Sequence, residues 1–132
     1  MKKTKLKKVS QREVPKLKRK LWTLVSLHIR QKYADENGVA KCYTCGQEYH
    51  WKALQAGHFI SRTHSSTLFD LENLRPQCFA CNIWKRGNAA EYSARLIEEI
   101  GLEKFKALIA RGREIKQWTA QELQELIEKF TC

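Results

Sequence analysis

Apolar residues recur at helical spacing near the start of this chain. From Pro15 to Gly38 they fall three and four positions apart, which predicts an amphipathic helix over residues 15–38. Pro15 suits the first turn of a helix, and Gly38 suits its end. The buried face of this helix should consist of Leu17, Leu21, Leu24, Val25 and His28, widened by Trp22 and Ile29.

The same periodicity returns in the last third of the chain. It predicts a C-terminal helical extension over residues 89–132. Two capping boxes mark helix starts in this part, Asn88 with Glu91 and Thr119 with Glu122. These helices carry no obvious chemistry, and we interpret them as a packing surface or a dimer interface.

Residues 39–88, between the two helical parts, lack a long periodic segment. They are typical of short extended pieces, including a strand from Leu54 to Ile60, followed by a short helix from Cys78 to Arg86. Short strands between helices predict an α+β fold. With 132 residues, the chain is long enough for a single domain with a modest core.

Positive charge is concentrated at the N-terminus. Residues 1–20 contain ten Lys and Arg against one Glu, and so carry +9 of the net charge of +11. This asymmetry indicates contact with a polyanion that depends on salt more than on sequence, and the alternative is a solubilising tail. We expect residues 1–14 to be a disordered basic arm. The basic residues of the following helix that would contact the polyanion are Lys16, Lys18, Arg19 and Lys20.

The chain has no apolar run of the roughly 18 residues that a membrane-spanning helix requires. The charged N-terminus also lacks the apolar stretch of a signal peptide. We therefore expect a cytoplasmic protein without a membrane partner. Because the cytosol keeps cysteines reduced, metal binding is favoured over disulfides.

Four cysteines form two C-x-x-C pairs, Cys42 with Cys45 and Cys78 with Cys81. Paired thiolates at this spacing are typical of tetrahedral zinc sites. Because four protein ligands leave no open coordination position, this zinc should be structural rather than catalytic. A redox-active dithiol is the competing interpretation, but the βαβ context of such motifs is missing.

A histidine and two asparagines lie in the same region. Fourteen residues separate His58 from Asn73, and eight separate Asn73 from Asn82. This spacing resembles that of the HNH (ββα-metal) nucleases, which include a subclass with zinc knuckles. The resemblance implies that His58 is the general base that activates water, and that Asn82 binds a catalytic Mg²⁺ or Mn²⁺ through its amide oxygen. It also implies that Asn73 holds the loop that orients His58, in an HNH core over residues 39–88 fastened by the zinc.

One position departs from the HNH pattern. Many HNH enzymes carry a metal-binding aspartate directly before the histidine, where this chain has Gly57. The metal would then rest on Asn82 with water and phosphate oxygens, or His64 or Asp70 would supply a further ligand. The residues expected to contact the DNA backbone near this site are Arg62, Lys85 and Arg86.

A closer resemblance covers roughly residues 40–130. Its motifs are Ala56-Gly57-His58-Phe59, the run from Phe69 to Asn73, Pro76-Gln77-Cys78, Cys81-Asn82, Gly87-Asn88 and Trp118-Thr119. These motifs are similar to those of the phage NinG (Rap) recombination proteins. The resemblance implies a recombination nuclease that cuts branched DNA, such as Holliday junctions and D-loops, in the cytoplasm of the host cell. Because cutting a junction needs two symmetric nicks, a homodimer is expected.

Two other functions stay open at the level of the sequence. The first is a zinc-containing DNA-binding module without catalysis, which the missing ligand at Gly57 favours. The second is a sequence-specific HNH endonuclease of the homing or restriction type. The short chain has no evident additional element for reading a DNA sequence, which argues against the second.

Overall fold

The computed structural model describes residues 9–131. Within them the fold consists of four α-helices and two small antiparallel sheets, which confirms the predicted α+β class. The helices and strands are α1 (Val14–Lys32), β1 (Val39–Lys41), β2 (Glu48–His50), β3 (Gln55–His58), β4 (Leu74–Gln77), α2 (Ala89–Ile100), α3 (Leu102–Gly112) and α4 (Ala120–Thr131).

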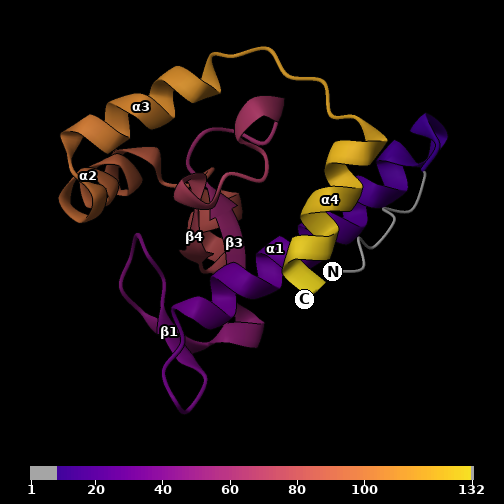
Figure 1. Cartoon of the computed structure of the whole chain (residues 1–132). Helices are drawn as coiled ribbons and strands as arrows, with labels where there is room; N and C mark the ends of the chain where they lie inside the picture. Colours follow the sequence, from indigo (N-terminus) through magenta and orange to yellow (C-terminus); the bar gives the residue numbers. More distant parts are fainter. Residues whose placement is uncertain (1–8, 132) are drawn as a thin grey trace, which may run out of the picture.

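The β3–β4 hairpin lies at the centre of the molecule. Its strands pair antiparallel, with Gln55 opposite Gln77 and His58 opposite Leu74. Figure 1 shows α1 and α4 on one side of this hairpin and α2 and α3 on the other. The second hairpin, β1–β2, pairs Val39 with His50 and follows directly after α1. The central hairpin therefore contacts elements from both ends of the chain.

Helix α1 presents the apolar face that its periodicity predicts. Leu17, Leu21, Val25 and Ile29 are buried, four residues apart, as expected for one side of a helix. This face packs against Leu123, Ile127 and neighbouring residues of α4, and together they form the largest core cluster. His28 is the exception to the prediction, because its side chain is exposed, with an edge-to-face contact to the ring of Phe130.

Helix α1 ends at Lys32, six residues before the predicted end at Gly38. The cause is Asp35, whose carboxylate accepts hydrogen bonds from the backbone N–H groups of Asn37 and Val39, each at 2.9 Å. A short polar side chain that bonds the following backbone competes with the helix and favours a turn. Gly38 adopts a φ of +78° within this turn rather than acting as the helix cap.

The predicted disorder of residues 1–14 is wrong for the part of this segment that the structure describes. Ser10 accepts a hydrogen bond from the Arg12 N–H at 3.3 Å and begins a 3₁₀ turn over Gln11–Glu13. The Gln11 side chain then accepts a hydrogen bond from the Ala120 N–H at 2.7 Å, which ties this turn to the start of α4. Residues 1–8 lie outside the described part of the chain.

The two predicted capping boxes have different outcomes. Thr119 and Glu122 form one at the start of α4, where the Thr119 hydroxyl accepts from the Glu122 N–H at 3.2 Å and the Glu122 carboxylate accepts from the Thr119 N–H at 3.4 Å. Asn88 precedes α2 but adopts a left-handed conformation with a φ of 50°, and its side chain makes no capping bond. The prediction of a capping box at Asn88 is therefore wrong.

The helices of residues 9–131 are each too short or too polar to span a membrane.

Candidate functional site

The four predicted zinc ligands lie together. Cys42 and Cys45 come from the turn between β1 and β2, and Cys78 and Cys81 follow β4. All four Sγ atoms lie within 4.8 Å of one another, and those of Cys45 and Cys78 are 3.9 Å apart. A tetrahedron with Zn–S bonds of about 2.3 Å needs sulfur separations of about 3.8 Å. The residues present therefore fit a metal ion such as zinc.

The ionisation of these thiols also fits a bound dication. Burial raises the pKa of Cys42, but hydrogen bonds from the backbone of Cys78 and Cys45 and from Thr44 outweigh this effect, so the pKa falls to about 6. Burial raises the pKa of Cys45 to about 12, and the neighbouring Cys42 adds to the increase. Ionisation of one thiol thus makes ionisation of the next less favourable, because the two negative charges repel each other. A dication that binds all four sulfur atoms offsets this repulsion.

A groove of about 920 Å³ runs along α1 and the end of β3, and we call it the basic groove. Both His58 and Asn82 line it. Five of its lining residues are cationic, and none is Asp or Glu: Lys18, Arg19, Arg30, Arg62 and Arg86. The groove therefore brings together the predicted base, the predicted metal ligand and a positive surface that suits a phosphate backbone.

His58 ends β3 and is held in one orientation. Its Nε2 lies 2.9 Å from the carbonyl oxygen of Leu68, and its ring stacks on Trp22 with centroids 4.8 Å apart. Because a carbonyl only accepts hydrogen bonds, this contact assigns the proton to Nε2. Nδ1 is then unprotonated and has a lone pair that can accept a proton. Burial lowers the pKa of His58; the Leu68 carbonyl opposes this effect, and the nearby Arg62 lowers the pKa further. The lowered pKa favours the neutral imidazole, which can accept a proton.

Asn73 closes the loop between β3 and β4. It is completely buried, and its Oδ1 accepts a hydrogen bond from the Ile60 N–H at 2.7 Å. Its Nδ2 donates to the carbonyls of Ile60 at 2.9 Å and Thr67 at 3.1 Å. Thr67 directly precedes Leu68, whose carbonyl orients His58. Asn73 thus contacts backbone on both sides of the loop that positions the histidine.

Asn82 lies in a π-helical turn, Ala80–Trp84, that follows the second cysteine pair. Its Nδ2 donates to Oε1 of Gln55 at 2.6 Å. This bond fixes the amide with its nitrogen toward β3, so that Oδ1 is the atom available to a cation. Gln55 begins β3, and no feature of the sequence marked it as the partner of Asn82.

The two alternative metal ligands of the loop lie elsewhere. Nδ1 of His64 is 3.2 Å from the carbonyl oxygen of Gly112, and the Asp70 carboxylate pairs with Arg111 at 2.7 Å. Both contacts fasten the loop to the end of α3, and neither residue lines the basic groove. In this arrangement neither His64 nor Asp70 lies beside Asn82, and either could join it at a metal only after leaving these partners.

Gly57 has a structural reason for lacking a side chain. A Cβ at this position would lie 1.9 Å from Oε1 of Gln77, whose side chain is fully buried. Successive residues of a strand point to opposite faces, so Gly57 faces Gln77 while His58 faces the groove. The amide of Gln77 donates to Thr44 at 3.1 Å and to the Gly87 carbonyl at 2.9 Å. The position before the histidine thus serves packing in this chain.

The predicted DNA-contacting residues divide into two groups. Lys18, Arg19, Arg62 and Arg86 line the basic groove, whereas the exposed Lys16, Lys20 and Lys85 lie outside its lining. Arg30 also lines the groove, and our sequence reasoning missed it. The signal was its spacing, because Lys18, Trp22, Ser26 and Arg30 recur every four residues on α1 and share one face.

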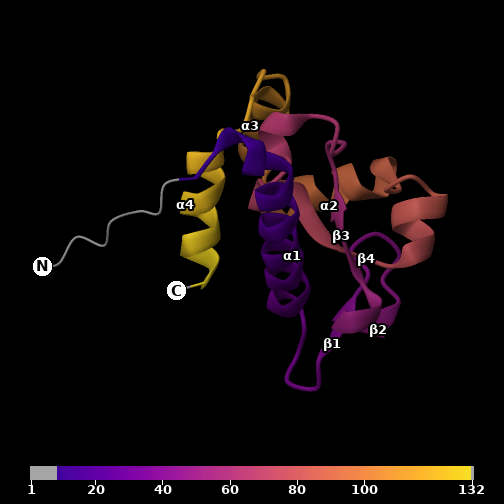
Figure 2. The ribbon, with the colours of Figure 1, turned by 90° about the vertical axis from the view of Figure 1, so that its right-hand side faces the viewer.

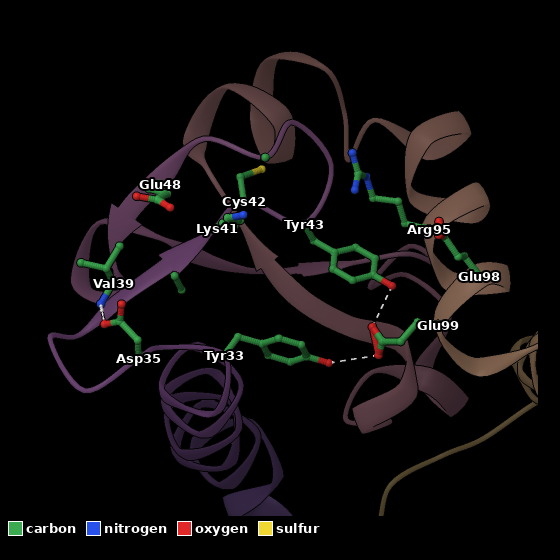
Figure 3. A pocket seen from close by; sticks show the side chains of 12 residues that line it. Tyr33, Asp35, Val39, Lys41, Cys42, Tyr43, Glu48, Arg95, Glu98 and Glu99 are labelled. Carbon is green, nitrogen blue, oxygen red and sulfur yellow. Dashed lines mark hydrogen bonds between the residues drawn. The ribbon is translucent and has the colours of Figure 1, made fainter.

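A second cavity, of about 600 Å³, lies between the first cysteine pair and α2 (Figure 3). Glu99 accepts hydrogen bonds there from the hydroxyls of Tyr43 at 2.9 Å and Tyr33 at 3.4 Å. It also pairs with Arg75, whose guanidinium lies 5.7 Å from the Tyr33 ring and 5.5 Å from the Tyr43 ring. These groups satisfy one another, and they connect α2 to both hairpins.

The comparisons with known proteins agree on one family. The family model described as Bacteriophage Lambda NinG protein matches residues 1–132. Proteins named ninG from Escherichia phage 933W and Salmonella phage P22 are 32% and 30% identical over 92 residues, or 67% of this chain. The chain spans less than half of the length of these relatives, 44% and 43% respectively. No solved structure matches. The chain therefore belongs to the NinG family.

Proposed function

We propose that this chain is a metal-dependent HNH endonuclease that cuts branched DNA, such as Holliday junctions and D-loops, in the cytoplasm of the host cell. The observation that carries the proposal is the meeting of His58 and Asn82 at one groove whose charged lining residues are all cationic. A strand presents the histidine, and a helical turn that follows the paired strand presents the asparagine. This order, two antiparallel strands and a helical turn, is the arrangement expected of a ββα-metal core.

The reaction begins at Nδ1 of His58, which accepts a proton from water. Nδ1 is the free acceptor because the Nε2–H group donates its hydrogen bond to the Leu68 carbonyl. The hydroxide attacks the phosphorus in line. A Mg²⁺ or Mn²⁺ ion at Oδ1 of Asn82 would supply charge that stabilises the leaving 3′ oxygen. Mg²⁺ commonly keeps several waters and takes substrate phosphate oxygens as ligands, so one protein ligand in a groove without carboxylates is compatible with its chemistry.

The cationic residues of the groove bind the phosphate backbone. Arg62 and Arg86 flank the two site residues, and Arg30 extends the positive surface along α1. Guanidinium groups suit bidentate phosphate contacts. Affinity should therefore fall steeply with salt and depend little on sequence. Two symmetric nicks at a junction require two such sites, and we propose that a homodimer provides them.

A cleavage assay with the full chain tests this proposal. His58→Ala is compared with His28→Ala, which removes an exposed histidine that does not line the groove. The substrates are a four-way junction and a linear duplex of the same sequence, with Mg²⁺, with Mn²⁺ or with neither. We expect junction cutting that needs the added metal, falls about a hundredfold or more in His58→Ala and persists in His28→Ala. The zinc content of each protein is measured in parallel, because loss of zinc from the cysteine cluster would also stop cutting.

The rival function is a zinc-containing DNA-binding module without catalysis. It is favoured by the absence of Asp and Glu from the groove lining and by the packing role of Gly57. Tight DNA binding by a folded, zinc-loaded chain that cuts neither substrate with either metal would establish the rival and reject the nuclease. Cutting of the linear duplex at one defined sequence would instead indicate a sequence-specific endonuclease.

A further inference from the structure

Three large apolar side chains stand exposed beside the basic groove. Phe79 and Ile83 are each 49% exposed and Trp84 is 76% exposed, and we call them the apolar ridge. The rings of Phe79 and Trp84 meet edge to face with centroids 5.6 Å apart. Ile83 also lines the basic groove, so the ridge continues directly from it.

The zinc site explains why these side chains point outward. Cys78 and Cys81 direct their sulfur atoms to the metal site and occupy the inner side of the turn. The Lys85 N–H donates a π-helical hydrogen bond to the Ala80 carbonyl at 2.9 Å. In a turn of this width, residues five apart lie on the same side, so Phe79 and Trp84 are neighbours on the outer surface. In Figure 2 this turn, between β4 and α2 along the chain, lies at the margin of the molecule away from α4.

The apolar ridge takes no part in the three core clusters of the described residues. A contiguous exposed apolar patch commonly marks an interaction site. Its neighbours Lys85 and Arg86 are cationic and exposed, and the adjoining groove is lined by cations. A two-fold contact between copies would place these like charges against each other, in a chain whose net charge is +11. An anionic partner with flat apolar faces fits the ridge better.

We propose that the apolar ridge stacks on base faces exposed at a branch point of DNA while the basic groove holds the adjoining backbone. Inside a linear duplex both faces of each base pair are covered by neighbours, whereas an open branch point, whose arms are not stacked end to end, exposes the faces of the base pairs that border it. Aromatic side chains stack on exposed bases with little preference for sequence. The ridge would therefore select for DNA structure. This inference rests on the proposed function, because it assumes that the groove beside the ridge holds DNA.

Binding of the full chain to a four-way junction and to a matched linear duplex tests the ridge. All proteins carry His58→Ala so that the DNA stays intact. Trp84→Ala is compared with Trp84→Phe, which keeps an aromatic face, and with Ile115→Ala, which removes an apolar side chain that is 99% exposed elsewhere. We expect Trp84→Ala to weaken junction binding about tenfold, leave duplex binding within about twofold, and be rescued by Trp84→Phe. Ile115→Ala should bind both DNAs unchanged.

The outcomes separate the ridge from the nuclease activity. Suppose that the chain with His58 intact cuts junctions, but Trp84→Ala still binds the junction more tightly than the duplex by the original factor. The ridge proposal is then rejected and the proposed function stands. If no cutting occurs but Trp84→Ala selectively loses junction binding, the ridge stands and the nuclease fails. A change in the sedimentation of the DNA-free chain in Trp84→Ala, with junction preference intact, would assign the ridge to contact between copies and overturn the proposal.

Discussion

At the scale of single residues, the surroundings of His58 decide its chemistry. Its ring stacks on Trp22 and its Nε2 contacts the carbonyl of Leu68, and both partners come from segments outside β3. Trp22 belongs to α1, ahead of the strand, and Leu68 to the loop that Asn73 closes. The histidine itself was identifiable from its spacing to the two asparagines. Its tautomer and its burial depend on partners that the spacing does not reveal.

The direction of the His58 pKa gives a prediction at this scale. Burial lowers the pKa below the ordinary 6.5, so the neutral form persists to lower pH than for a free histidine. Trp22→Ala removes the covering ring, lets water reach the imidazole and should move the pKa back up toward 6.5. NMR titration of the His58 ring protons measures both values. A wild-type midpoint at or above 6.5, or no upward shift in Trp22→Ala, would contradict this account of the histidine.

The same burial has a consequence for folding. The unfolded chain protonates His58 at a higher pH than the folded chain does, so the unfolded state binds more protons in the interval between the two pKa values. The contribution of His58 to stability is therefore present above pH 6.5 and decreases as the pH falls below it. Its neutral form is favoured by folding and by the proposed reaction alike.

At the scale of elements, the cysteine pairs determine how the hairpins meet. The first pair closes the turn between β1 and β2, and the second follows β4 and begins the turn that carries Asn82. A backbone bond from the Tyr43 N–H to the Pro76 carbonyl, at 2.8 Å, joins the two parts as well. The four clustered cysteines thus lie where a bound metal would fix the position of Asn82 relative to β3, and with it the shape of the basic groove.

Loss of one thiolate tests this element-level role. Cys78→Ser should bind zinc far more weakly and lose cooperative folding of residues 39–88, because metal binding and folding are coupled. Metal analysis and thermal unfolding followed by circular dichroism measure the two effects. Cys132→Ser is the matched control, since Cys132 belongs to neither C-x-x-C pair, and it should keep its zinc. A normally folded Cys78→Ser protein without zinc would show that the metal is dispensable for the fold.

At the scale of the whole molecule, the C-terminal helices are part of the main core. The face of α4 that packs on α1 contains Ala120, Leu123 and Ile127, and the same cluster reaches Ala56 and Leu74 of the central hairpin. Residues 89–132 therefore contribute a layer of the main core through α4 and are more than an extension added to it. Helix α1 carries lysine and arginine side chains that line the groove, and α4 packs against its apolar face.

A cavity in this interface should destabilise the entire chain. Leu123→Ala removes a fully buried side chain and should lower the free energy of unfolding by about 2–5 kcal/mol. If the molecule is one cooperative unit, tryptophan fluorescence and far-ultraviolet circular dichroism will report a single shifted transition in denaturant. Leu102→Ala, at a half-exposed position of α3, should have a much smaller effect. Two separate transitions in Leu123→Ala would show that α1 and α4 unfold independently of residues 39–88.

The sequence by itself determined the features that depend on local spacing. The apolar period of α1, the two cysteine pairs and the interval from His58 through Asn73 to Asn82 are each readable because one helix face, one knuckle or one loop imposes them. The end of α1 was misplaced because a single side chain, Asp35, redirected the backbone. That competition is local, but it is decided by a balance of similar energies that a pattern does not resolve.

Only the tertiary structure decided which distant groups meet. Gln55 binds Asn82, Arg30 joins the groove, Asp70 pairs with Arg111, and Gln77 fills the space beside Gly57. The exposure of Trp84 belongs to the same class, since an apolar residue in a short helix is ordinarily expected inside. Each of these contacts joins segments that are far apart in the sequence. The exposure of Trp84 depends on which side of its turn the cysteines occupy. Such outcomes follow from how the elements pack, and packing is a property of the folded chain as a whole.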